Sequence, residues 1–172
     1  NGATEITAPS GYVPSSLNSQ TIVNANVTIN HPGSNFNWDG NGSSDTTING
    51  TALLSITANQ IDTPLGDNTF GGTITLNDSG DLTVNNSLGE WQMAGSLIKN
   101  GAGVSTISGA TFVLTSSAQV NGGTLDVNAQ SIYTGSSNLI VANGATADLS
   151  TTRIDVGATL TANGTITIGA LT

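Results

Sequence analysis

Two aspartates occupy equivalent places in neighbouring stretches of the sequence. Asp126 is the fifth residue after Asn121, and Asp148 is the fifth residue after Asn143. If these stretches form parallel strands that stack about 4.8 Å apart, both carboxyl groups face outward from one surface. Stacked carboxylates suit a bound cation, and at about 5–5.5 Å they suit the acid pair of a retaining glycosidase. A solvated acidic column is the third interpretation, and Asp126 and Asp148 are candidate metal ligands.

A second acidic segment has the spacing of a calcium loop. Residues 39–45, Asp-Gly-Asn-Gly-Ser-Ser-Asp, place oxygen-bearing side chains at alternate positions, as the first half of such a loop does. Gly50 stands where the loop needs a bidentate glutamate. Asp39 and Asp45 are therefore candidate calcium ligands, and a polar turn with Asx hydrogen bonds is the alternative.

Two aromatic segments are candidates for contact with a partner. Phe36 and Trp38 lie in one segment, and Glu90, Trp91 and Met93 lie in the other. A tryptophan on a loop stacks on a sugar ring or anchors a protein partner. The alternative is that these side chains fold back and cover an apolar edge of the core.

The residues that most catalytic sites need are scarce. Lys99 and Arg153 are the only basic residues, His31 is the only histidine, and the chain has no cysteine. This set assembles neither a nucleophilic triad nor a zinc site. The sequence predicts no catalytic residues and no enzyme activity, with a polysaccharide-cleaving β-helix as an alternative.

Composition and charge narrow the class of protein. The 172 residues include 22 Gly, only 8% are charged, and the net charge is −9. Abundant Asn, Ser, Thr and Gly disfavour helices, whereas short apolar pairs recur evenly, so an ordered β protein is expected. Two basic residues cannot neutralise a phosphate backbone, so we expect no nucleic-acid partner. No apolar run approaches about 18 residues, so we expect no membrane insertion by this segment.

Asn-Gly steps recur about every 21 residues along the chain, and such a period is typical of solenoids. We place Gly71-Gly72 in the same position, because a Thr-Ile-Thr-Leu strand follows it as similar strands follow the Asn-Gly steps. This alignment predicts that Thr75 and Thr167 share a column with the two aspartates. The predicted rows begin at Asn49, Gly71, Asn100, Asn121, Asn143 and Asn163.

Three short alternating segments follow one another within each row. The sequence therefore predicts an all-β fold, a right-handed parallel β-helix (β-solenoid) with about 21 residues and three short strands per turn. Residues 1–20 contain two prolines and little alternation, and we expect an N-terminal cap or linker there. The β-helix is expected over 21–172, with side-loop insertions near 30–47 and 85–96.

Residues 97–127 carry a family resemblance. They contain Lys-Asn-Gly-Ala-Gly at 99–103, Ile-Ser-Gly-Ala at 107–110 and Gly-Gly-Thr-Leu-Asp-Val at 122–127, and Trp-Asp-Gly precedes them at 38–40. These segments resemble the passenger-associated repeat of bacterial autotransporters, although the aromatic step usual after Gly109-Ala110 is missing. The resemblance implies export and a surface role, and it names no ligand.

Together these features predict a non-catalytic structural or adhesive module of a secreted or cell-surface bacterial protein, such as a rigid stalk or passenger. A subunit that stacks end to end into an extracellular filament is the alternative, because a solenoid has open strand edges at both ends. A glycan-binding or glycan-cleaving β-helix is the third hypothesis. The expected partners are other copies or repeats of the same protein, or a cell-surface glycan or protein. No cofactor is expected, and a bound calcium ion is the alternative.

Overall fold

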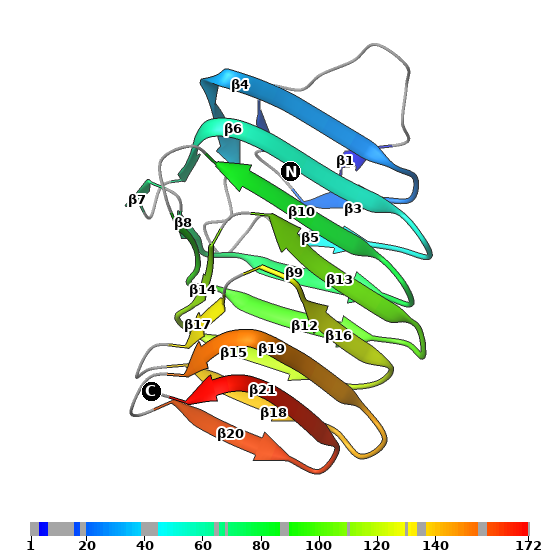
Figure 1. The fold of residues 1–172 in the computed structure, drawn as a ribbon. Helices are drawn as coiled ribbons and strands as arrows, with labels where there is room; N and C mark the ends of the chain where they lie inside the picture. The colour runs from blue at the N-terminus through cyan, green and yellow to red at the C-terminus, as the bar shows by residue number, and fades with distance from the viewer. Residues whose placement is uncertain are drawn as a thin grey trace.

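The computed structural model describes residues 4–6, 16–17, 20–38, 45–63, 66–67, 69–86, 90–109, 111–129, 131–133, 137–154 and 158–171. Across these residues every regular element is a β-strand, and every strand pairing is parallel except that of β6 with β7. The strands wind into a solenoid with about 22 residues per turn (Figure 1). The predicted all-β parallel β-helix is therefore confirmed.

One flat side of the coil, which we call face 1, is an eight-stranded sheet. Each of its strands comes from a successive turn, so neighbouring strands are about one repeat apart in sequence. The strands pair in the order β1 (Thr4–Ile6), β3 (Thr21–Val23), β5 (Thr46–Ile48), β9 (Thr73–Asn77), β12 (Ser96–Asn100), β15 (Ser117–Val120), β18 (Asn138–Val141) and β20 (Thr159–Ala162).

A second, bent sheet supplies the other two sides, face 2 and face 3. Its longest strands turn the corner, as β19 does by pairing with β16 through Asp148 and with β17 through Arg153. Each turn therefore has three sides, as predicted. Face 2 contains β10 (Asp81–Asn86), β13 (Val104–Gly109), β16 (Thr124–Val127) and the first residues of β4 (Val27–Trp38), β6 (Leu53–Thr63), β19 (Thr146–Ile154) and β21 (Thr165–Leu171); face 3 contains β2 (Ser16–Leu17), β8 (Thr69–Phe70), β11 (Trp91–Met93), β14 (Phe112–Leu114), β17 (Ser131–Tyr133) and the last residues of those long strands.

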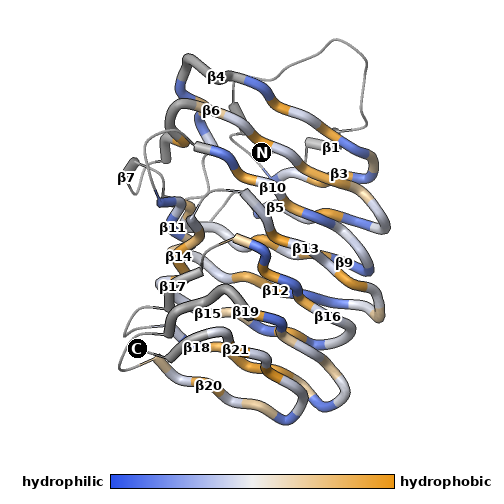
Figure 2. The backbone as a smooth tube through the Cα atoms, in the orientation of Figure 1, coloured by the Kyte–Doolittle hydropathy of each residue, from blue (hydrophilic) through white to orange (hydrophobic). Residues whose placement is uncertain are grey.

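Alternating hydropathy creates the core of the coil. In β9 the residues alternate between half-buried and buried, and the buried ones are Ile74 and Leu76. Figure 2 shows the same alternation along the described strands of successive turns. Equivalent positions stack inside the coil, as Leu97, Ala118 and Leu139 do along face 1. Each large aliphatic side chain buried in this way contributes about 1.5–3 kcal/mol.

A ladder of asparagine side chains runs along the corner between face 1 and face 2. Each carboxamide nitrogen donates to the carboxamide oxygen one coil earlier, which leaves the inner members both donating and accepting. The bonds run from Asn49 Nδ2 to Asn24 Oδ1 (2.9 Å), from Asn77 to Asn49 (2.8 Å), from Asn100 to Asn77 (3.3 Å) and from Asn121 to Asn100 (3.0 Å). The ladder therefore links coils through side chains, in addition to the backbone hydrogen bonds between strands.

The ladder corrects one predicted row. The pairing of β9 with β5 and β12 brings Asn77, rather than Gly71, into line with Asn49 and Asn100. The predicted row at Gly71 is wrong because a different pair of residues makes this turn. Asp78 has a φ of 54°, a left-handed conformation that aspartate tolerates better than most residues. An Asn-Asp step therefore serves here where Asn-Gly serves in other turns.

The structure describes part of the predicted cap and of the predicted side loops. Within residues 1–20, for which a cap or linker is predicted, β1 pairs with β3 and β2 pairs with β4. The described part of 30–47 belongs largely to strands, and residues 39–44 lie outside the described residues. Residues 85–96 contribute to strands on all three faces of the coil, and residues 87–89 lie outside the described residues. A described excursion is β7 (Gly66–Asp67), which turns back antiparallel on β6.

Removing the central ladder asparagine tests the contribution of the ladder to stability. Asn77→Ala deletes one donor and one acceptor, and it leaves polar groups of Asn49 and Asn100 without their partners. We expect the free energy of unfolding from urea titration to fall by about 1–3 kcal/mol. Asn143→Ala is the matched control, because this turn asparagine lies outside the ladder and should change stability by less than about 0.5 kcal/mol. Equal effects of the two substitutions would contradict a stabilising ladder.

Candidate functional site

The predicted acidic column exists on face 2. Asp126 and Asp148 are direct partners on β16 and β19, and Thr167 follows on β21. The preceding neighbour is Thr106 of β13. The predicted neighbour Thr75 was wrong, because it lies on face 1 in the misassigned row.

Hydrogen bonds occupy part of this column. Asp81, one coil before Thr106, accepts a bond from the Thr106 backbone N–H at its Oδ1 (2.7 Å). Asn128 Nδ2 donates to Asp126 Oδ2 over 3.2 Å. Within the described ranges, no three His, Cys, Asp or Glu side chains gather closely enough to hold a metal. The column thus has the geometry of a half-exposed acidic ladder, and its cation and glycosidase interpretations stay predictions.

Asp45 joins coils in the structure. Its backbone oxygen accepts a bond from Thr21 N–H (2.8 Å), and its Oδ1 accepts one from Thr73 N–H (2.8 Å). One of the carboxylate oxygens that the calcium interpretation requires therefore already contacts the first residue of β9. The other candidate in that loop, Asp39, lies outside the described residues.

The aromatic candidates form a stack inside the coil. Trp38 and Trp91 are only 1% and 2% exposed, and their rings lie 5.7 Å apart and nearly parallel, at 11°. Phe112 continues the stack beyond Trp91, and Phe70 lies against both tryptophan rings; the sequence patterns had singled out neither residue. Aromatic pairs at such distances gain about 0.5–1.5 kcal/mol beyond their burial.

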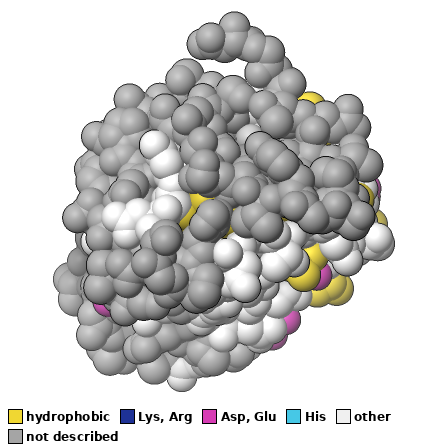
Figure 3. Space-filling view, turned by 90° about the horizontal axis from the view of Figure 1, so that it is seen from above, with side chains coloured by type: hydrophobic (Ala, Val, Ile, Leu, Met, Phe, Trp, Pro, Cys, Tyr) yellow, Lys and Arg dark blue, Asp and Glu magenta, His cyan; other side chains and the backbone are white. Residues whose placement is uncertain are grey.

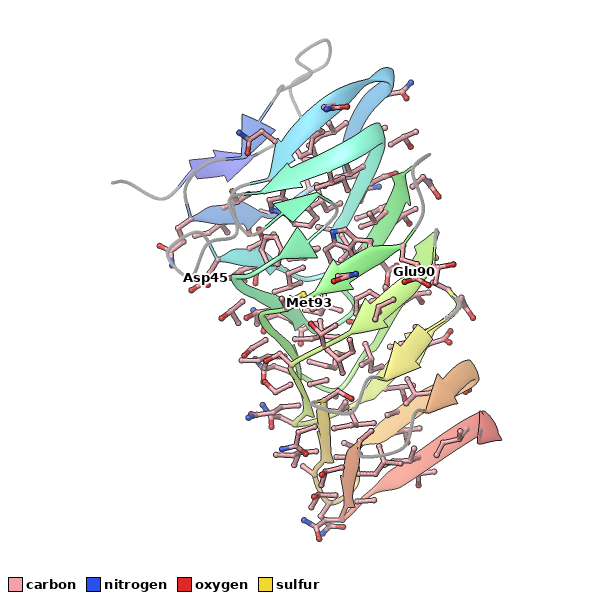
Figure 4. All side chains as sticks on the ribbon, turned by 90° about the vertical axis from the view of Figure 1, so that its left-hand side faces the viewer. Asp45, Glu90 and Met93 are labelled. Atoms are coloured by element: carbon pink, nitrogen blue, oxygen red, sulfur yellow. The ribbon has the colours of Figure 1, made fainter. Side chains whose placement is uncertain are left out.

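Burial assigns most of the proposed contact residues to packing. Phe36 and Met93 are 0% exposed, so they are inaccessible to a partner, as are the two tryptophans. Figure 4 shows Met93 among the side chains inside the coil, with Asp45 and Glu90 at its surface. Glu90, directly before β11, is the exposed member of the predicted set.

The two stacked tryptophans differ in the partners of their ring nitrogens. Trp38 Nε1 donates to Thr46 Oγ1 across the interior (3.2 Å). Trp91 Nε1 is buried and has no hydrogen-bond partner among the described residues. Leaving a buried donor unpaired costs about 1–3 kcal/mol, so the fold retains Trp91 for the area and stacking of its ring.

Substitution by phenylalanine separates the two roles. Trp38→Phe and Trp91→Phe remove the same atoms, but only the first breaks a hydrogen bond. We expect Trp38→Phe to lower the free energy of unfolding by about 1–2 kcal/mol more than Trp91→Phe does. Guanidinium titration measures both, and an equal or larger loss for Trp91→Phe would contradict the assignment.

Lys99, one of the two basic residues of the chain, faces into the coil. It is 0% exposed and lies between Leu76 and Val120 in an inward column. Its Nζ donates to the backbone oxygens of Asn100 (2.6 Å) and Gly101 (3.2 Å). Burial lowers the Lys99 pKa from its usual 10.5, and the charge of nearby Asp78 partly opposes this shift. The Lys99 ammonium therefore holds the turn at Asn100 and Gly101 through two hydrogen bonds, and burying its charge costs desolvation free energy.

The lowered pKa of Lys99 makes stability depend on pH. Between the native pKa and 10.5 the unfolded chain binds more protons than the folded chain, so stability rises with pH over this window. We expect the wild-type chain to gain stability relative to Lys99→Met as the pH rises from neutral to about 10.5. Urea titrations across this range measure the difference. Gln119→Met on the next strand should show no such trend, and a pH-independent difference for Lys99→Met would contradict the lowered pKa.

The outer surface of face 1 is uncharged from β3 to β20. Lys99 is the one charged residue in these strands, and its side chain points inward. The outward central column holds β-branched residues, among them Thr75, Ile98 and Ile140, and one amide, Gln119. Asp81, Asp126 and Asp148 instead lie on face 2, and Figure 3 shows the visible acidic side chains near the rim of the described surface. From β3 to β20, one flat side of the coil therefore presents no outward charge in a chain of net charge −9.

Comparisons with known proteins found no similar protein. No family model matches the chain, and no match was found among curated proteins or solved structures. The described residues include no helix of the length and apolarity needed to cross a membrane.

Proposed function

We propose that the chain is a non-catalytic structural and adhesive module of a secreted or cell-surface bacterial protein, similar in role to an autotransporter passenger. The observation that carries this proposal is the uncharged outer surface of face 1. Covering a charged surface requires desolvation of each charge, whereas hydroxyl, amide and aliphatic groups are covered at much lower cost. Face 1 is therefore the side of this acidic coil best suited to contact with an extended, uncharged partner such as a neutral glycan.

Rigidity supports a role as a spacer. From β9 to β20 each strand of face 1 pairs with the next in unbroken register. The asparagine ladder and the aromatic stack cross several coils in the same direction. A coil linked in this way transmits load along its length and keeps its sides flat.

Charge substitutions on two sides test the adhesive surface. Thr75→Lys with Gln119→Lys places two charges in one column of face 1, two coils apart, and Thr124→Lys with Thr165→Lys does the same on face 2. We expect retention on neutral polysaccharide beads to fall at least about tenfold for the face 1 pair and to change little for the face 2 pair. Equal losses, or no retention of the wild-type chain, would contradict adhesion through face 1.

Location and assembly state complete the test. An antibody against the chain should label intact cells of the source organism or its culture medium, and labelling only after permeabilisation would contradict the proposal. End-to-end stacking of copies into an extracellular filament is the alternative. Fibres of the purified chain in electron micrographs would support stacking, whereas monodisperse particles support a module.

A further inference from the structure

Five Asn-Gly steps lie within the described residues, and they differ sharply in their surroundings. Asn49 and Asn100 are inner members of the ladder, so each donates through Nδ2 and accepts through Oδ1. Asn121 ends the ladder and only donates within it. Because the dipeptide is the same in each case, differences in reactivity between these sites report on structure rather than on sequence.

Asn143 is displaced from the ladder by one residue. Ala142 occupies the ladder position, because Val120 pairs with Val141 and the next residues, Asn121 and Ala142, follow in line. The Asn143 side chain is exposed and hydrogen-bonds to none of the described residues. The turn around it is closed by a single bond, from Ala145 N–H to the Ala142 oxygen (3.0 Å).

Gly144 makes the neighbouring backbone accessible. It has a φ of 77°, and a side chain added there would meet nothing within 4 Å. Gly101, the equivalent residue after Asn100, is by contrast crowded by the backbone and carboxylate of Asp78. Packing therefore opposes distortion of the turn at Asn100-Gly101 but not at Asn143-Gly144 or Asn49-Gly50, so at Asn49 only the ladder can oppose it.

We propose that Asn143-Gly144 is a site of spontaneous deamidation in the folded protein, and that the ladder protects the Asn-Gly steps inside it. The Gly144 backbone nitrogen loses its proton to solvent base and attacks Cγ of Asn143. A ring N–Cγ bond forms, the Cγ–Nδ2 bond breaks, and the nitrogen leaves as ammonia after taking up a proton. Water then opens the succinimide at either carbonyl and yields aspartate or isoaspartate.

Protection by the ladder follows from its hydrogen bonds. Cγ of Asn49 or Asn100 reaches the next backbone nitrogen only when its carboxamide leaves both ladder partners. Each hydrogen bond corresponds to about a fivefold factor in the opening equilibrium, so two correspond to on the order of twentyfold. Modification at Asn143 adds a negative charge at an exposed turn, whereas modification at Asn100 would remove a donor from the ladder.

Peptide mapping of the folded chain after incubation at mildly alkaline pH measures each site separately. In urea, Asn49, Asn100 and Asn143 should form aspartate and isoaspartate at similar rates, since each precedes glycine. In the folded chain we expect Asn143 to keep most of its rate in urea, while Asn49 and Asn100 slow by on the order of twentyfold. Similar slowing at all three sites, or faster reaction at Asn49 or Asn100 than at Asn143, would overturn the proposal.

A substitution that breaks the ladder tests whether its hydrogen bonds slow deamidation. Asn77→Ala removes a ladder partner of both Asn49 and Asn100, so both should deamidate faster while Asn143 does not change. Thr75→Ala on the same strand leaves the ladder intact and should change none of the three rates. Unchanged rates at Asn49 and Asn100 in Asn77→Ala would show that the ladder is not what protects them.

Discussion

Stacking of each coil on the next in fixed register is the constraint on which the other features of the molecule depend. Backbone bonds between parallel strands set the spacing, and side chains at equivalent positions then fall into columns. Because each coil repeats the same position, the interactions of one residue type are repeated along the whole column. Aliphatic groups become a continuous core, asparagines become a ladder, and aromatic rings become a stack, whereas aspartates become neighbouring charges that solvent must screen.

The polar columns differ in whether stacked side chains of one type can hydrogen-bond to each other. Asparagine suits a corner column because its carboxamide both donates and accepts, so each member satisfies the next. Aspartate cannot donate, and in the column on face 2 only Asp126 and Asp148 stack directly: Thr106 separates Asp81 from Asp126, and Thr167 follows Asp148. Face 1 avoids the problem by presenting no outward charge from β3 to β20. The distribution of charge between the sides is thus a consequence of stacking.

Two buried polar groups depart from these rules. Lys99 occupies a position where other coils place Leu76 and Val120, and it is tolerated because its ammonium reaches the oxygens of the adjacent turn. The Nε1 of Trp91 finds no partner among the described residues, although that of Trp38 does. In both cases burial of a polar group costs free energy. The turn that Lys99 closes offsets this cost in one case, and the packing of the Trp91 ring offsets it in the other.

Local pattern was enough to predict the fold class. Alternation of period two, turn residues at a regular interval and the absence of helix formers identify a parallel β-solenoid of three strands per turn, and the stacking of Asp126 on Asp148 followed from the spacing of two Asn-Gly steps alone. Register elsewhere could not be derived in this way. Thr-Ile-Thr-Leu at 73–76 fits face 1 and face 2 equally well as a local sequence, and only pairing with β5 and β12 decides between them. Likewise, whether Trp38, Trp91 and Lys99 point inward depends on neighbours one coil away, because a strand residue faces the core or the solvent according to the register of the whole stack.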